Sequence, residues 1–312
     1  MGCSVKRALL LASTCLLALV AHAATFYVIV AGLGGEPEYE QRFATAANDL
    51  DRIFKAADAT ARVNTLVGAQ ATAARFRDTM NMVEREAKTD DDFVLILIGH
   101  GSFDGVEYKF DLPGPDVTAT EIAAMCDRVS ARRQLIVDTT SASGGAMQVL
   151  EKPGRAVVAA TKSGTEKNAT VFARYWVDAF EDPSADIDKS GSVSAMEAFL
   201  YATEKTAAFY NTEKRLATEH AVFNDVGHGE PVREPGNGQG MLLSNLTLLR
   251  LGASQLAAND PAKRALLDKK EELEQKIDIL KYRKAAMDPA DYKKQLTDAL
   301  VELSKVQEKL EQ

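Results

Sequence analysis

The sequence has little cysteine, histidine or tryptophan: its 312 residues include three cysteines, four histidines and one tryptophan. Cys3 and Cys15 lie in an N-terminal segment that we expect to be removed, which leaves Cys126 alone and excludes an internal disulfide. His220 and His228 are too isolated in the sequence to form a zinc site. Basic residues number 37 against 45 acidic ones, so the net charge is −8. Such an acidic chain is a poor partner for nucleic acid or anionic membranes.

The N-terminus has the pattern of a secretory signal peptide. Lys6 and Arg7 precede an apolar run from Ala8 to Val20, and Ala21-His22-Ala23 provides the small residues that a signal peptidase accepts. The run is too short to remain in a bilayer. We therefore predict export to the periplasm or the extracellular space, cleavage after the first 23 residues, and a charge of about −10 once Lys6 and Arg7 are lost. A lipoprotein site at Cys15 is the weaker alternative, because its preceding Thr14 is larger than the usual Gly or Ala.

The next part of the chain alternates strand and helix patterns, which predicts an α/β domain over residues 24–180. A mainly parallel sheet covered by helices on both faces, a three-layer sandwich, is the expected architecture. The helix after residue 117 begins with a capping box formed by Thr118 and Glu121. The predicted strands are apolar and rich in β-branched residues: 26–31, 62–67, 93–98, 135–139 and 155–161.

The C-terminal part divides into two segments. Residues 181–256 are predicted to hold a metal-binding loop and helical structure that complete the domain. Residues 257–312 are rich in Lys, Glu, Leu and Ala, with Asp288-Pro289 between two helical patterns, and predict an antiparallel helical hairpin with a coiled-coil seam. That hairpin could bind a coiled-coil partner or a second copy, or it could be a solvated tail without a partner.

Two predicted strand ends carry side chains suited to catalysis. One strand continues into Gly99-His100-Gly101, and a later one into Asp138-Thr139-Thr140-Ser141-Ala142-Ser143-Gly144. The carboxyl ends of neighbouring parallel strands meet at one edge of a sheet. An imidazole would then lie beside a group of hydroxyls, with backbone N–H groups free to bind an oxyanion.

These two strand ends resemble those of the cysteine peptidases that include legumain, caspases, gingipains and the catalytic subunit of glycosylphosphatidylinositol transamidase. In that family an apolar strand ends in His-Gly, and a further strand ends in Asp-x-Cys or Ala-Cys followed by x-Ser-Gly. His100-Gly101 matches the first element, and residues 135–145 match the second except at the nucleophile. Alignment on Ser143-Gly144 places Ser141 at the cysteine position, whereas alignment on Asp138-Thr139 places Thr140 there. The resemblance implies a caspase-like fold in an exported, bacterial-type homologue that lacks the catalytic cysteine.

The missing thiol decides the expected activity. A thiol beside an imidazole is readily ionised, whereas a hydroxyl needs a base that a third group orients, and the family uses only a dyad. We therefore expect Ser141 to support little or no peptidase activity, and Cys126, on an apolar helix face, to serve packing. The resemblance also assigns the loop at residues 160–166 to the substrate pocket, where Glu166 could attract a basic side chain.

The sharpest motif is a calcium-binding loop of the EF-hand type over residues 186–197. Gly191 stands at the sixth place, where the chain turns sharply, and Val193 at the apolar eighth place. Three carboxylates predict weak affinity, with a dissociation constant of roughly 10⁻⁴ to 10⁻³ M. The predicted ligands are Asp186, Asp188, Ser190, Ser192, Ser194 and Glu197.

The sequence thus predicts an exported peptidase homologue that is inactive or weakly active, binds a peptide or protein ligand, and holds a structural calcium ion. One alternative is an active hydrolase with Ser141 as nucleophile and His100 as base. Another is a coiled-coil scaffold whose old site is vestigial.

Overall fold

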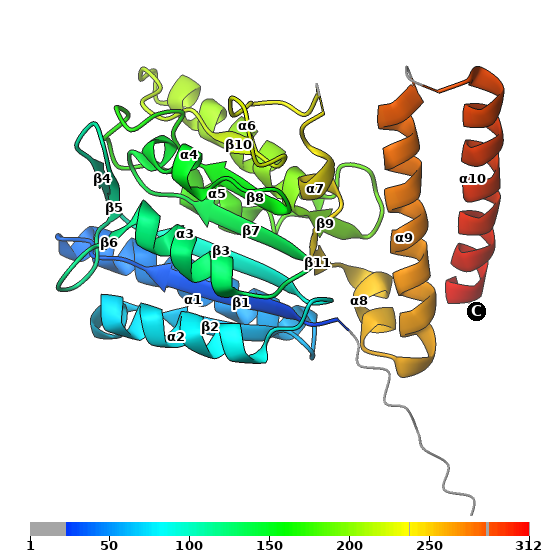
Figure 1. Cartoon of the computed structure of the whole chain (residues 1–312), viewed down its shortest axis with the longest axis horizontal. Coiled ribbons are helices and arrows are strands. Elements are labelled where there is room, and N and C mark those ends of the chain that lie inside the picture. Colours follow the sequence, from blue (N-terminus) through cyan, green and yellow to red (C-terminus); the bar gives the residue numbers. More distant parts are fainter. Residues whose placement is uncertain (1–22, 237, 285–286, 312) are drawn as a thin grey trace, which may run out of the picture.

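The computed structural model describes residues 23–236, 238–284 and 287–311, and a six-stranded sheet forms its centre (Figure 1). The strands lie in the order β10-β8-β7-β3-β1-β2. Each neighbouring pair is parallel except β10 with β8, so the predicted mainly parallel sheet is confirmed. The strands are β1 (Thr25–Ala31), β2 (Arg62–Leu66), β3 (Asp92–Ile98), β7 (Arg133–Asp138), β8 (Arg155–Ala159) and β10 (Val222–Asn224).

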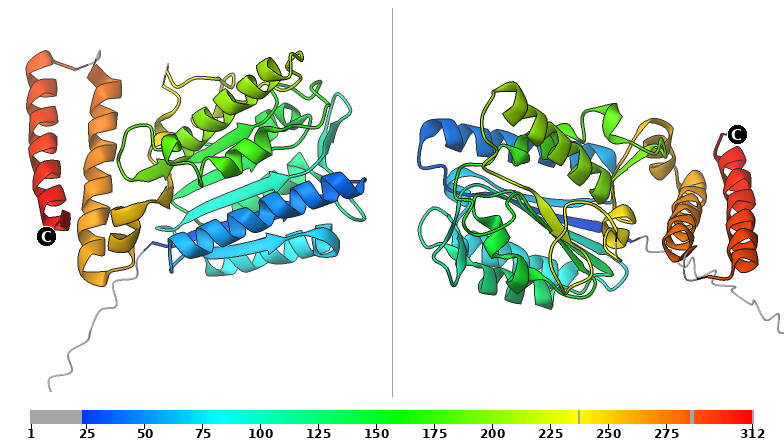
Figure 2. Two further views of the ribbon diagram at one scale, coloured as in Figure 1. Left: turned by 180° about the vertical axis from the view of Figure 1, so that it is seen from behind. Right: turned by 90° about the horizontal axis from the view of Figure 1, so that it is seen from above.

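Helices cover both faces of this sheet, because its central strands are apolar on both sides. In β1, Tyr27 and Ile29 belong to one apolar core, while Val28 and Val30 belong to the other. Alternate side chains of a strand point to opposite faces, so a strand without polar positions must be buried on both faces. One face packs against α1 (Pro37–Ala57), α5 (Phe172–Asp178) and α6 (Ala195–Thr212), and the other against α2 (Ala73–Glu86), α3 (Ala119–Arg128) and α4 (Met147–Leu150), as Figure 2 shows.

The carboxyl ends of the parallel strands meet a small second sheet. Its three antiparallel strands lie in the order β4-β5-β6 and follow directly after β3. The capping box that begins α3 is present as predicted: the Thr118 hydroxyl accepts from the Glu121 amide at 3.1 Å, and the Glu121 carboxylate accepts from the Thr118 amide at 3.1 Å. The strands are β4 (Gly101–Phe103), β5 (Tyr108–Phe110) and β6 (Val117–Thr118).

The amino ends of the parallel strands face the C-terminal segments. β9 and β11 form an antiparallel pair there, and α9 and α10 lie side by side beyond them (Figure 1). α9 also contacts α7 and α8, whereas the main contacts of α10 are with α9. These elements are β9 (Ser192–Ser194), β11 (Thr247–Arg250), α7 (Met241–Ser244), α8 (Gly252–Ala258), α9 (Pro261–Arg283) and α10 (Pro289–Glu311).

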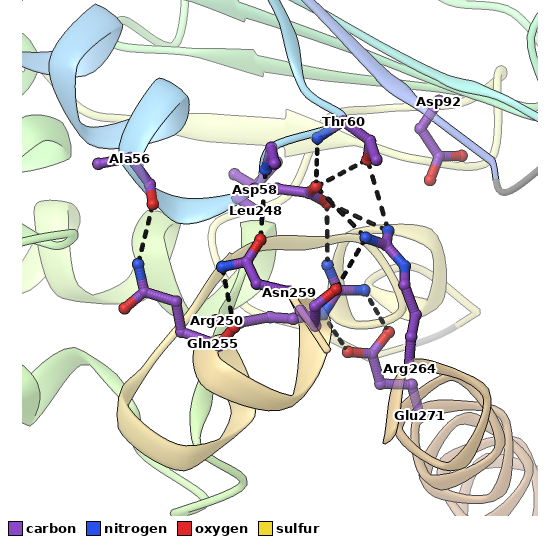
Figure 3. Close-up of polar contacts among 12 residues, drawn as sticks. Ala56, Asp58, Thr60, Asp92, Leu248, Arg250, Gln255, Asn259, Arg264 and Glu271 are labelled. Atoms are coloured by element: carbon purple, nitrogen blue, oxygen red, sulfur yellow. Dashed lines mark hydrogen bonds and ion pairs between the residues drawn. The ribbon is translucent and has the colours of Figure 1, made fainter. Parts of the chain in front are cut away.

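A charged cluster joins the C-terminal segments to the α/β domain (Figure 3). The Asp58 carboxylate, just after α1, lies 3.3 Å from Arg264 of α9 and 3.6 Å from Arg250 of β11. Arg250 is paired in turn with Glu271 of α9 at 2.7 Å. Arginines this well covered are stable only when paired, so the cluster fixes the first half of α9 against the domain.

Several short elements were not predicted from the sequence. β9, β10 and β11 contain three or four residues each, too few for a periodic pattern. A 3₁₀ turn (η1, Gly68–Gln70) precedes α2, and the Thr72 hydroxyl caps that helix. Two further 3₁₀ turns are η2 (Ser143–Gly145) and η3 (Pro183–Ala185).

Across the described ranges, no helix combines the length and the apolar character needed to cross a bilayer. The predicted signal peptide falls almost entirely on residues 1–22, which lie outside those ranges.

Candidate functional site

His100 lies at the carboxyl end of β3, the position expected from the sequence. Its ring packs edge-on against two aromatic side chains of α1, with centroid distances of 4.9 Å to Tyr39 and 5.1 Å to Phe43. The ring is partly buried by these contacts. The imidazole therefore packs against an apolar wall, and among the described residues no hydrogen bond joins it to a carboxylate that would orient it as a base, although Asp111 lies close enough for the two charges to interact.

Ser141 lies on the neighbouring strand end, three residues after β7, and is only 3% exposed. Its hydroxyl donates to the Gly101 carbonyl at 3.0 Å and accepts from the Gly101 amide at 3.1 Å. The two strand ends are thus adjacent, since Gly101 follows His100 directly. Within the described part of the chain no hydrogen bond joins the imidazole to this hydroxyl. The hydroxyl instead acts as donor and as acceptor toward the Gly101 backbone.

Thr140, the alternative nucleophile position, belongs to a buried network. Its hydroxyl lies 2.7 Å from Asp138 Oδ1 and 2.6 Å from the Tyr108 hydroxyl, and all three residues are at most 1% exposed. Burial raises the pKa of Asp138 to about 6, although hydrogen bonds from Thr140 and Tyr108 oppose the shift. Burial and the Asp138 charge likewise raise the pKa of Tyr108 well above its usual value. The sequence did not reveal this network, because Tyr108 comes from the small sheet.

The turn after Ser141 was expected to offer free N–H groups, but three of its amides are bonded within the protein. The Ala142 amide donates to the Glu166 carbonyl at 2.8 Å, and Ala142 has a left-handed φ of 58°. The Gly144 amide donates to the Thr161 hydroxyl at 2.9 Å, and the Gly145 amide to the Ala142 carbonyl at 2.8 Å. These three groups are satisfied within the protein, so they do not form a ready oxyanion site.

Close packing explains the glycines of this turn. A Cβ on Gly144 would come within 2.2 Å of the Ser163 amide nitrogen, and one on Gly145 within 2.7 Å of the Phe103 ring. The turn is therefore pressed against the loop after β8 and against β4.

Glu166, predicted to bind substrate, uses its carboxylate within the protein. Oε1 lies 2.5 Å from Nδ1 of His220, and Oε2 accepts from the Lys162 amide at 2.9 Å and the His220 amide at 3.2 Å. The side chain is 12% exposed. These bonds tie the loop after β8 to the segment before β10, an arrangement that leaves little of the carboxylate open to a ligand.

The predicted calcium loop lies at the other end of the sheet, between η3 and α6. The Asp186 carboxylate accepts from the amides of Ser190 and Gly191 at 3.0 and 3.1 Å. Gly191 has a φ of 81°, which only glycine adopts without strain. Asp186 thereby closes the first half of the loop around its own side chain.

Glu197 closes the second half. One carboxylate oxygen accepts from the Ile187 amide at 2.9 Å, and the other from the Ser194 amide at 2.9 Å as part of a capping box. Burial raises the pKa of Glu197, and the charge of Asp188 raises it further. The acidic end of the loop is therefore held in place while its negative charges remain close together.

The donor set fits a calcium ion. Oxygens of Asp186, Asp188 and Glu197 lie within 4.8 Å of one another. Calcium binds oxygen at about 2.3–2.6 Å, so two ligands of one ion are at most about 5 Å apart. Asp188 and Glu197 line a small cavity of about 40 Å³ together with Ser190, Ser192 and Ser194, and the hydroxyls of Ser190 and Ser192 are 2.9 Å apart. The three predicted carboxylate ligands therefore lie together, and the predicted serine ligands line the cavity beside Asp188 and Glu197.

Comparison with known proteins gives distant structural likeness only. No protein-family model and no curated protein matches the chain. The crystal structure of the Drosophila initiator caspase Dronc is similar at 11% identity and a TM-score of 0.43, over 67% of this chain and 82% of that one. Protein GSU0716 from Geobacter sulfurreducens is similar at 12% identity and a TM-score of 0.46, over 74% of this chain and 100% of that one. At these identities the likeness concerns the fold and not the function.

Proposed function

We propose that this chain is an exported binding protein built on a peptidase-like α/β domain, in which peptidase chemistry is lost or very weak. Its ligand is a peptide or a protein, and a calcium ion braces the segment between the domain and the C-terminal helices. The carrying observation is the hydroxyl of Ser141, which is bonded on both sides to the backbone of Gly101.

The surroundings of Ser141 argue against acyl transfer. A nucleophilic hydroxyl must give its proton to a base, and the reacting carbonyl oxygen needs free donors nearby. Here the hydroxyl proton is held by the Gly101 carbonyl, and the His100 ring packs on Tyr39 and Phe43. The amides of Ala142, Gly144 and Gly145 are bonded elsewhere. An edge of the sheet with this organisation is better suited to binding than to covalent chemistry.

Calcium binding is supported by the loop geometry. The three carboxylates converge from both ends of the loop, and serine oxygens complete an all-oxygen donor set, which calcium prefers. When bound, the ion would neutralise charges that the fold otherwise holds against their own repulsion. A structural ion therefore accounts for why the chain places these acids together.

A serine-directed covalent probe tests the loss of catalysis. We expect a fluorophosphonate to leave the wild-type chain unlabelled under conditions that label a serine hydrolase added to the same tube. The matched variant is His100→Ala, which should behave like the wild type. Labelling at Ser141 that depends on His100 would instead establish the hydrolase alternative and end this proposal.

A further inference from the structure

Helix α9 lies directly against the calcium loop, although the two are far apart in the sequence. The Lys270 ammonium donates to the Ser190 carbonyl at 2.8 Å and is paired with Glu274 on the same helix at 2.8 Å. Lys270 is 8% exposed, so this contact is largely removed from solvent. The fifth residue of the loop thus has a fixed partner on α9.

The helix also brings acidic side chains to the loop. Glu274 lines the cavity that Asp188 and Glu197 line, and Asp188 and Glu274 are close enough to repel each other. Asn245 is a partly buried residue that also lines this cavity, and its side-chain oxygen has no hydrogen-bond partner among the described residues. A cation in the cavity would reduce the repulsion between the neighbouring carboxylates.

We propose that α9 is part of the calcium site, with Glu274 acting on the ion from outside the twelve-residue loop. This inference rests on the calcium binding proposed above and adds a partner to it. Without a cation, the charge of Asp188 opposes the approach of Glu274, and the Lys270 ammonium offsets that repulsion. A divalent cation reverses that balance, because it attracts the carboxylates on both sides.

The coupling must act in both directions. If calcium strengthens the contact of α9 with the loop, then that contact strengthens calcium binding by the same factor. Lys270 keeps the helix in register when the ion is absent, and Glu274 supplies the dependence on the ion. α9 is therefore expected to be more stable with calcium than without it.

Calcium titration of the full chain by calorimetry tests the role of Glu274. We expect Glu274→Gln to weaken calcium binding roughly five-fold, near the lower end of measured couplings between sites. The matched control is Glu272→Gln, the same change on the same helix at a side chain that is 68% exposed and paired with Lys269. That control should bind calcium like the wild type. Equal affinity of the two variants would overturn the inference.

Hydrogen exchange tests the role of α9 separately from calcium binding by the loop. We expect calcium to slow exchange both in the loop and in α9, and Glu274→Gln to remove most of the effect in α9 at a calcium concentration that still saturates the loop. Slowing in the loop alone would refute the role of α9 while leaving calcium binding intact. No response in either segment would refute calcium binding, and the inference with it.

Discussion

Replacing Glu197 by glutamine is expected to abolish the calcium-dependent part of the thermal stability. Calcium at about 100 times its dissociation constant should stabilise the wild-type chain by about 2.7 kcal/mol. For a chain of this size that gain corresponds to a rise of about 4 °C in melting temperature. Glutamine can still cap α6, because an amide oxygen also accepts from the Ser194 amide. It removes the charge and the bidentate oxygen pair that calcium needs.

The measurement is the melting temperature with excess calcium and with a chelator, for the variant and the wild type. Glu204→Ala, an exposed position on the same helix, is the matched control and should keep the full calcium response. A variant that still responds to calcium like the wild type would show that Glu197 is not a ligand. A wild type without any response would show that the loop does not bind the ion.

The second large effect concerns the buried carboxyl at the end of β7. Asp138→Asn should become more stable relative to the wild type as the pH rises. Burial raises the pKa of Asp138 to about 6 in the folded protein, whereas the unfolded value is near 3.8. The folded wild type therefore binds the proton more tightly and loses stability as the pH rises from about 4 to above 6. At about 1.4 kcal/mol per pKa unit, the loss amounts to roughly 3 kcal/mol.

The asparagine variant cannot ionise, so it escapes this loss. Its oxygen can still accept from the Thr140 hydroxyl, which donates to Asp138 Oδ1 at 2.7 Å in the wild type. The test is chemical denaturation of both proteins at about pH 4 and about pH 8, with the exposed change Asp90→Asn as control. We expect the difference in unfolding free energy between Asp138→Asn and the wild type to grow by roughly 2–2.5 kcal/mol over that range. A difference that is independent of pH would contradict a raised pKa at this position.

The parts of the fold that the sequence predicted are those with a strong local pattern. β1 and β3 are continuous apolar runs, and the cap of α3 needs only Thr118 and Glu121. β10 and the β9–β11 pair are different, because their partners define them. Val222–Asn224 forms a strand because it pairs with β8. The hydrophobic pattern of these three residues alone does not predict a strand.

The candidate site divides in the same way. The adjacency of the His100 and Ser141 strand ends followed from the parallel order of β3 and β7. The sequence did not predict that the Ser141 hydroxyl bonds to the Gly101 backbone, because this contact depends on how closely Gly101 approaches across the edge of the sheet. The contact of Lys270 with the loop spans 80 residues of sequence, so no spacing within the calcium motif could reveal α9.

Five of the six strands of the central sheet run in one direction, so the sheet has one edge of carboxyl ends and one edge of amino ends for these strands. Ser141 and Asp138 lie where the strands finish, whereas the loop of Glu197 and α9 lies where they begin. A strand of seven residues such as β3 spans about 23 Å, far beyond the range at which substitutions usually influence each other. The energetic effects of Asp138→Asn and Glu197→Gln should therefore simply sum in the double variant. Substitutions around the Ser141 hydroxyl should therefore leave the acidic loop at the other end of the sheet undisturbed.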